Sequence, residues 1–268
     1  MTSKLRQTPT QSPANLTPPR RPMPKFVELW VYLSATPLFG LTATLLVYVL
    51  AHAVYQRVGH APWANPVMWS VLTLGGGLLL TGVPYPTYFA GAQFIHFLLG
   101  PAVVALAWPL WQRRAELRQR WARLLLAALA GGTAASLSAL LMAWGFDLPL
   151  EVMVALAPKS VTAPVAMGIA DKLGGIAALA AVFAVLTGLI GAVAGKYLFD
   201  ALRIEQSGTG WAVRGFALGT AAHGIGAARA LQVHPDAGAY AALALGLQVV
   251  LATLLMPLLV PALLRLLQ

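Results

Sequence analysis

The chain has 268 residues, of which 59% are hydrophobic and only 10% are charged, and its mean hydropathy is +0.73. No ordinary soluble domain is this apolar, so the composition predicts a polytopic membrane protein. The absence of cysteine excludes a disulfide framework and thiol chemistry. The net charge of +10 resembles that of nucleic-acid-binding proteins, but five of the 18 basic residues lie in residues 1–25 and five more in 113–123. Such clusters are typical of membrane topology signals, and we expect no nucleic-acid partner.

Residues 1–25 are rich in Pro, Ser, Thr and basic residues, which predicts a disordered basic tail before a membrane domain at 26–268. The apolar run that follows the tail is too long for a signal peptide, and a first span is expected from about Pro37. A second span is expected at 66–80. Three consecutive glycines, Gly75 to Gly77, predict a close helix contact there.

An apolar stretch at 87–111 is interrupted at Gly100 and Pro101. It is either a single span, which puts the N-terminus outside, or a re-entrant hairpin, which puts the N-terminus inside. The basic segment 113–123 is expected to be a cytoplasmic loop. A span at 124–144 follows it and ends in an acidic loop suited to the outer side.

The next stretch carries a polar interruption between Pro158 and Pro164, with Lys159 inside it. Two prolines six residues apart forbid one continuous helix, because each lacks an N–H group and constrains the residue before it. The apolar runs 148–156 and 165–170 are each too short to cross a bilayer. We therefore expect two half-helices that meet at membrane depth, where irregular backbone is tolerated only when it is buried or lines a cavity.

A second interrupted element is expected at 214–229, with helix breaks at Gly219 and Gly226. It follows a long helix at 176–202 and precedes a last span at 238–267. An interrupted stretch followed by a long span thus recurs at 87–144, 149–202 and 208–267. The predicted fold class is an all-α polytopic membrane protein with discontinuous, broken or re-entrant helices, and this recurrence is compatible with internal inverted repeats.

Lys159 is the first candidate for binding chemistry, because a lysine inside a membrane element is expensive. Its amine could neutralise a carboxylate, helped by the hydroxyls of Ser160 and Thr162 and by the positive ends of half-helices. The structural alternative is a lysine that snorkels to the interface.

His223 is the second candidate, because its unperturbed pKa near 6.5 lets it carry a proton at physiological pH. Gly224 beside it allows close backbone approach. The structural alternative is a buried histidine that bonds a freed backbone carbonyl. Arg214 is expected in a loop and Arg229 at the membrane interface. No metal set, nucleotide loop or nucleophile–base pair emerges, so we expect no enzyme, cofactor or metal.

Three blocks resemble the LrgB/CidB family: residues 99–111, residues 158–167 running into Gly174 and Gly175, and residues 215–226. The resemblance covers about 36–267. It implies a multi-pass protein of the bacterial cytoplasmic membrane that works with a small holin-like LrgA/CidA protein in controlling murein hydrolase export and lysis. Plant relatives resemble plastidal glycolate/glycerate translocators, and bacterial members have been linked to pyruvate uptake.

The main hypothesis is therefore a secondary carrier of small monocarboxylates, either 2-hydroxy or 2-oxo acids, with proton coupling through His223. Lys159 would supply charge, while Ser160, Thr162 and Thr220 would supply hydrogen bonds. The alternative is a holin-associated regulator without a stoichiometric substrate. Expected partners are membrane lipid, the substrate, a separate LrgA/CidA-like protein and further copies of the chain.

Overall fold

The structure is a computed structural model that describes residues 37–98, 101, 104, 105, 107–112 and 114–267. The predicted tail at 1–25 and the predicted break residue Gly100 lie outside the described residues. The described part of the chain contains helices and no strands. Its elements are α2 (Pro37–Arg57), η1 (Pro62–Ala64), α3 (Pro66–Thr81), α4 (Tyr85–Phe97), α6 (Ala107–Gln112), α7 (Arg114–Gly145), α8 (Leu150–Leu156), α9 (Ala163–Lys172), α10 (Ala177–Ala201), α11 (Gly208–Val233) and α12 (Pro235–Leu267).

Within these ranges, four helices are long and apolar enough to cross a membrane, since a span needs about 20 apolar residues. They are the helices at Leu38–Arg57, Arg118–Gly145, Ala177–Ala201 and Pro235–Leu266. The all-α, polytopic fold class is therefore confirmed.

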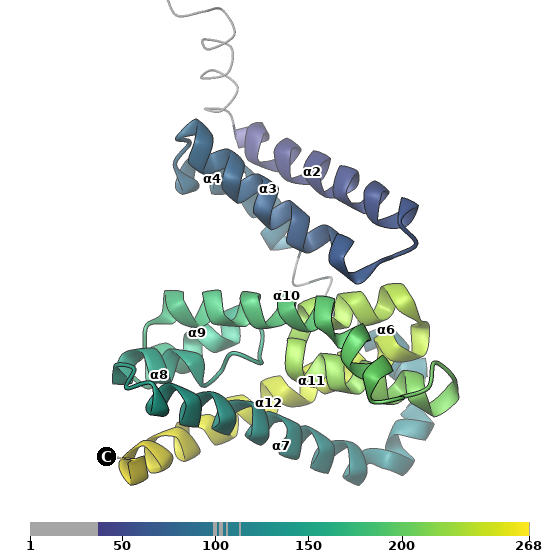
Figure 1. Ribbon diagram of the computed structural model, residues 1–268, viewed down its shortest axis with the longest axis vertical. Coiled ribbons are helices and arrows are strands. Elements are labelled where there is room, and N and C mark those ends of the chain that lie inside the picture. Colours follow the sequence, from purple (N-terminus) through teal and green to yellow (C-terminus); the bar gives the residue numbers. More distant parts are fainter. Residues whose placement is uncertain (1–36, 99–100, 102–103, 106, 113, 268) are drawn as a thin grey trace, which may run out of the picture.

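The helices form two groups (Figure 1). Helices α3 and α4 each pack on α2. Helices α6 to α12 form a larger body, which meets the first group where η1 contacts α10. The predicted close contact at Gly75 to Gly77 is wrong for the described part of the chain, in which a Cβ added at any of the three would meet no heavy atom within 4 Å. Helix α3 instead buries residues of its first two turns, Pro66 and Ser70.

The prediction of a loop at 113–123 is also wrong, because α7 begins at Arg114 and runs unbroken to Gly145. Arg, Leu, Gln, Glu and Ala have high helix propensity, so a span can continue as a helix into its basic flank.

Helices α7 and α12 run in the same direction. Ala128 shares a cluster with Tyr240 and Ala244, and Leu140 shares one with Val260 and Leu264.

The predicted break between Pro158 and Pro164 is present, because α8 ends at Leu156 and α9 begins at Ala163. The chain also folds back there. Gly175 lies so close to Val154 that an added Cβ would be 2.7 Å from its Cγ1. A straight helix would separate these two positions, 21 residues apart, by roughly 32 Å. Helices α8 and α9 therefore form a hairpin, named here the first hairpin.

Helix α11 is a second hairpin, made of two helical legs that meet at a sharp kink. His223 alone leaves helical geometry, with φ 40° and ψ −132°. The rings of Trp211 and His234 stack with centroids 4.8 Å apart, whereas a straight helix would place these residues roughly 35 Å apart. An added Cβ at Gly226 would likewise lie 2.6 Å from the carbonyl oxygen of Leu218, eight residues earlier. The chain therefore reverses at His223.

The predicted breaks at Gly219 and Gly226 need correction, because both glycines lie in helical backbone on either side of the turn. They serve close packing instead. A Cβ on Gly219 would lie 2.8 Å from Cα of Ala241 in α12, and one on Gly226 would strike the opposite leg of its own hairpin.

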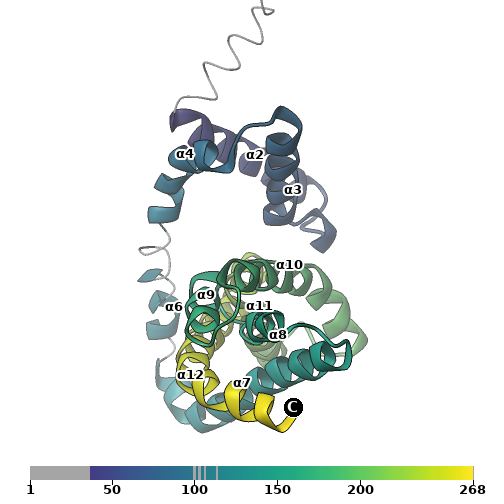
Figure 2. The same cartoon turned by 90° about the vertical axis from the view of Figure 1, so that its left-hand side faces the viewer.

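The two hairpins open toward opposite ends of the bundle, because the single long helix α10 lies between them in the chain. Each hairpin is followed by a long span, α10 or α12, as the recurrence in the sequence predicts. The 87–111 stretch differs from these two hairpins, because its helices pack in different places. Helix α4 ends at Phe97, before Gly100 and Pro101, and packs on α2, whereas α6 packs on α12. Figure 2 shows α8 and α11 enclosed by α7, α9, α10 and α12.

Candidate functional site

The turns of the two hairpins lie against the same stretches of α7 and α10. We name residues 157–162 the first tip and residues 220–224 the second tip. On α7, the Ser136 hydroxyl donates to the Ala157 carbonyl at 3.0 Å. Thr220 of the second tip packs on α7 as well, and a Cβ on Gly131 would lie 2.8 Å from its Cγ2. These contacts are five residues apart on one helix, so both tips meet the middle of α7.

On α10, both tips converge at Ala184. Val161 of the first tip shares a buried cluster with Ala184. The ring of His223 donates from Nε2 to the Ala184 carbonyl at 2.7 Å, because a carbonyl oxygen only accepts. Half-helix ends that meet deep in a helical bundle are the usual setting of transporter binding sites.

The amine of Lys159 is partly buried and does not reach out of the bundle. Its Nζ donates to the Ala135 carbonyl at 3.1 Å and to the Ser160 hydroxyl at 3.4 Å. Within the described ranges it forms no ion pair. Thr162 is the N-cap of α9 but makes no side-chain cap bond, so first-turn N–H groups of α9 keep their positive character near the amine. This tip is electropositive.

The second tip is tightly packed on one side and open on the other. His223 is only 3% exposed, and a Cβ on Gly188 of α10 would lie 2.9 Å from its ring atoms Cε1 and Nε2. At Gly224, in contrast, an added Cβ would meet no atom of the described residues within 4 Å. Thr220 is 6% exposed, and its buried hydroxyl has no hydrogen-bond partner among the described residues. Such a hydroxyl can bind a ligand without giving up an existing bond.

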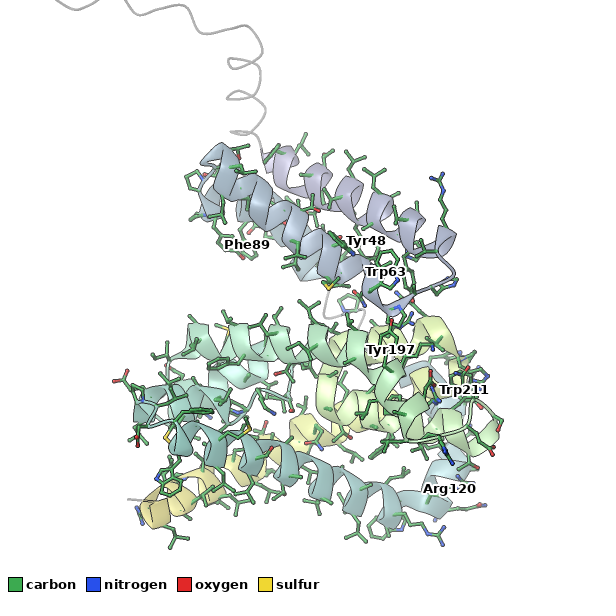
Figure 3. All side chains as sticks on the ribbon, in the orientation of Figure 1. Tyr48, Trp63, Phe89, Arg120, Tyr197 and Trp211 are labelled. Atoms are coloured by element: carbon green, nitrogen blue, oxygen red, sulfur yellow. The ribbon has the colours of Figure 1, made fainter. Side chains whose placement is uncertain are left out.

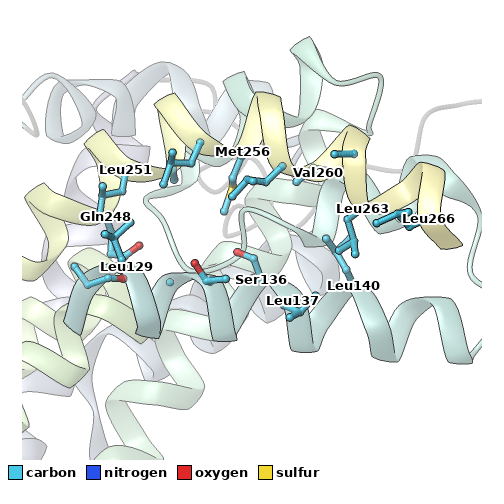
Figure 4. A pocket seen from close by; sticks show the side chains of 17 residues that line it. Leu129, Ser136, Leu137, Leu140, Gln248, Leu251, Met256, Val260, Leu263 and Leu266 are labelled. Atoms are coloured by element: carbon cyan, nitrogen blue, oxygen red, sulfur yellow. Dashed lines mark hydrogen bonds between the residues drawn. The ribbon is translucent and has the colours of Figure 1, made fainter. Parts of the chain in front are cut away.

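A cavity of about 330 Å³ lies between α7 and α12 beside the first tip (Figure 4). Its walls are mostly apolar, with polar atoms from Ser136 and Gln248. Lys159 and His223 do not line it. Ser136, which does, is bonded to the first tip, so the predicted site residues lie behind the cavity wall rather than in it.

Ser136 and Gln248 were not predicted as site residues, and the predicted loop position of Arg214 is wrong. Gln248 is 4% exposed and donates to the Ala128 carbonyl at 2.6 Å. Arg214 is not in a loop but is buried in α11, where Nη2 donates to Asp200 at 2.7 Å. Arg229, which was expected at the membrane interface, is 6% exposed within the protein, with its guanidinium 5.3 Å from the ring centroid of Tyr55. A lone polar residue in an apolar run is the signal that could have found them.

A family model described as the LrgB-like family matches residues 44–262. The chain is 35% identical to the uncharacterized protein YwbG of Bacillus subtilis, over 74% of this chain and 86% of the relative. It is 30% identical to the holin-like protein CidB of Staphylococcus aureus, over 81% of this chain and 93% of the relative. It is 32% identical to the uncharacterized protein YxaC of Bacillus subtilis, over 81% and 92%.

No solved structure matches the chain. The four apolar helices and these bacterial relatives identify a multi-pass bacterial membrane protein. The family match extends from α2 to α12 and includes both hairpins. The chain belongs to the LrgB-like family.

Proposed function

We propose that this protein is a holin-like component of the bacterial cytoplasmic membrane that works with a small LrgA/CidA-type membrane protein to control murein hydrolase export and lysis. The observation that carries this proposal is the similarity to the holin-like protein CidB over 93% of that protein's length. The exposed apolar surfaces of α2 and α3, with residues such as Leu46, Leu50 and Leu80 more than half exposed, offer room for lipid or a partner.

The test is to express the chain in a bacterial host with and without an LrgA/CidA-type protein. Murein hydrolase activity in the medium and the rate of lysis are then measured. We expect both to change only when the two proteins are present together. Unchanged hydrolase activity and lysis in the presence of both proteins would contradict the proposal.

A second function, the carriage of small monocarboxylates, is favoured by the first tip. Lys159 is a partly buried cation without a described counter-ion, next to the uncapped N-terminus of α9. Both features attract an organic anion in a medium of low dielectric constant. The free hydroxyl of Thr220, together with Ser160, Thr162 and the open space at Gly224, would complete the binding groups.

In this proposal the cavity between α7 and α12 is a route to the tips, and the bond between Ser136 and Ala157 is its inner barrier. Movement of the first hairpin away from α7 would break that bond and the bond from Lys159 to Ala135 together. The amine would then be free to bind a carboxylate. His223 would carry the coupled proton.

Uptake of labelled glycolate and pyruvate into proteoliposomes tests the carrier. A carrier saturates with substrate concentration and discriminates between similar acids, whereas a pore does neither. We expect Lys159→Ala and His223→Ala to reduce uptake at least about tenfold, the effect of losing one charge-assisted hydrogen bond. The control Lys172→Ala removes an exposed cation at the end of α9 and should leave uptake unchanged. Saturable uptake that survives both site substitutions would refute the site but not the transport activity.

A further inference from the structure

A second cavity lies at the open end of the α11 hairpin, far from its tip. It encloses about 240 Å³ where α10 and both legs of α11 meet the turn that follows α2. We name it the mouth pocket. Its principal polar and aromatic lining residues are His60, Lys196, Gln206, Trp211, Arg214 and Arg229. Figure 3 labels Trp211 at one end of the larger helical body, with Tyr197 and Trp63 near its junction with the α2 to α4 group.

The charge of the mouth pocket is strongly positive. Three cationic side chains line it, and no carboxylate does so among the described residues. Asp200 lies behind the wall and accepts from Lys196 and from Arg214, each at 2.7 Å. One carboxylate therefore pairs with two of the three lining cations, and Arg229 has no described carboxylate partner.

Arg229 is thus the lining cation whose charge is not balanced. Its side chain is almost fully buried, one guanidinium nitrogen donates to the His60 carbonyl at 3.0 Å, and Nη1 has no hydrogen-bond partner in the described part of the chain. The hydroxyl of neighbouring Tyr55 is also buried and unpaired. Buried donors without partners are rare, because each costs the full desolvation of the group. A guanidinium donates to carboxylate and phosphate oxygens in a fixed fork geometry.

We propose that the mouth pocket binds an oxyanion, a carboxylate or phosphate group, through Arg229 with Lys196 and Arg214. The pocket lies at the end of the bundle where α7 begins, since Ala212 near the start of α11 shares a cluster with Ala128 and Leu124. The Arg-rich start of α7 puts that end in the cytoplasm by the positive-inside rule. The site is separate from the two tips and does not rest on either proposed function.

The full chain is purified and its thermal midpoint is measured with acetate or inorganic phosphate replacing chloride at constant ionic strength. A ligand that binds only the folded protein raises the midpoint. We expect both anions to raise it in the wild type and in the control Arg203→Gln, which removes an exposed cation near the pocket that does not line it. In Arg229→Gln, the anion concentration for half of the shift should rise about 10- to 100-fold, as for the loss of a charge-assisted bond.

A lipid headgroup is a second source of the same oxyanion. If a lipid headgroup occupies the pocket, the thermal midpoint should be higher in phosphatidylglycerol nanodiscs than in phosphatidylcholine nanodiscs. Added acetate or phosphate should then change the midpoint little. That result supports the site and assigns its source, provided that Arg229→Gln abolishes it. If Arg229→Gln does not fold, Lys196→Gln replaces it, since it keeps the bond from Arg229 to His60 and should still weaken binding.

Two results would overturn the proposal. One is a wild type that responds to neither soluble anions nor anionic lipid. The other is an Arg229→Gln protein with a lower midpoint in the absence of ligand but with the same anion response as the wild type. Arg229 would then only join α11 to the turn after α2.

Discussion

Gly219→Ala tests the close approach of α11 and α12, on which the position of the second tip depends. A Cβ on Gly219 would lie 2.8 Å from both Cα and the carbonyl carbon of Ala241 and would overlap its carbonyl oxygen. Optimal contacts between heavy atoms lie at about 3.5–4.0 Å. Because the obstacle is backbone, one of the two helices has to move.

The magnitude follows from two opposing effects. Overpacking of this kind costs about 1–3 kcal/mol, while replacing glycine by alanine in a helix contributes about 0.5–1 kcal/mol of stability. We therefore expect Gly219→Ala to destabilise the protein by about 1–2 kcal/mol. Gly224→Ala is the matched control five residues along the same hairpin, because its Cβ would meet nothing within 4 Å. It should be neutral or slightly stabilising.

The assay is thermal unfolding of both variants in the same detergent. A gap of about 2 kcal/mol between them corresponds to roughly 4–8 °C in the midpoint for a chain of this size. Equal midpoints for Gly219→Ala and Gly224→Ala would refute the close packing of α11 on α12.

Two further substitutions test buried polar groups. Thr220→Val removes a buried hydroxyl without a described partner, so the free energy of unfolding should stay level or rise by up to about 1 kcal/mol. Thr44→Val loses bonds to the Gly40 carbonyl and the Tyr88 hydroxyl, so it should lower the thermal midpoint. A fall for Thr220→Val as large as that for Thr44→Val would show that the Thr220 hydroxyl is bonded. Asp200→Asn leaves a buried arginine without its carboxylate and should lower the midpoint more than the exposed control Asp171→Asn does. Equal midpoints for these two would mean that the ion pair adds no stability.

The helix breaks could be predicted from the sequence where proline forces them. Pro158 and Pro164 forbid a continuous helix by their covalent structure, and the break lies between them in the fold. The glycines near His223 gave a weaker signal, since glycine permits a break without requiring one. The chain turns at His223, while Gly219 and Gly226 provide the space in which the turn packs.

The direction of each half-helix after its break could not be predicted, because local sequence does not determine whether a chain continues or folds back. Contacts between distant residues decide this, such as the stacking of Trp211 on His234. The burial of the two arginines could not be predicted for the same reason. Arg214 is stabilised by Asp200, fourteen residues earlier, and Arg229 by the carbonyl of His60, 169 residues earlier.

The chain has no cysteine, so introduced cysteine pairs can be cross-linked without background. The most direct test of the account is the double variant Trp211→Cys with His234→Cys under mild oxidation, read by mass spectrometry of the linked tryptic peptides. A hairpin that reverses at His223 predicts rapid, intramolecular cross-linking of this pair and none for Trp211→Cys with Gly224→Cys. No cross-link between positions 211 and 234 would mean that α11 is not folded back, and the meeting of two hairpin tips at α7 and α10 would be contradicted.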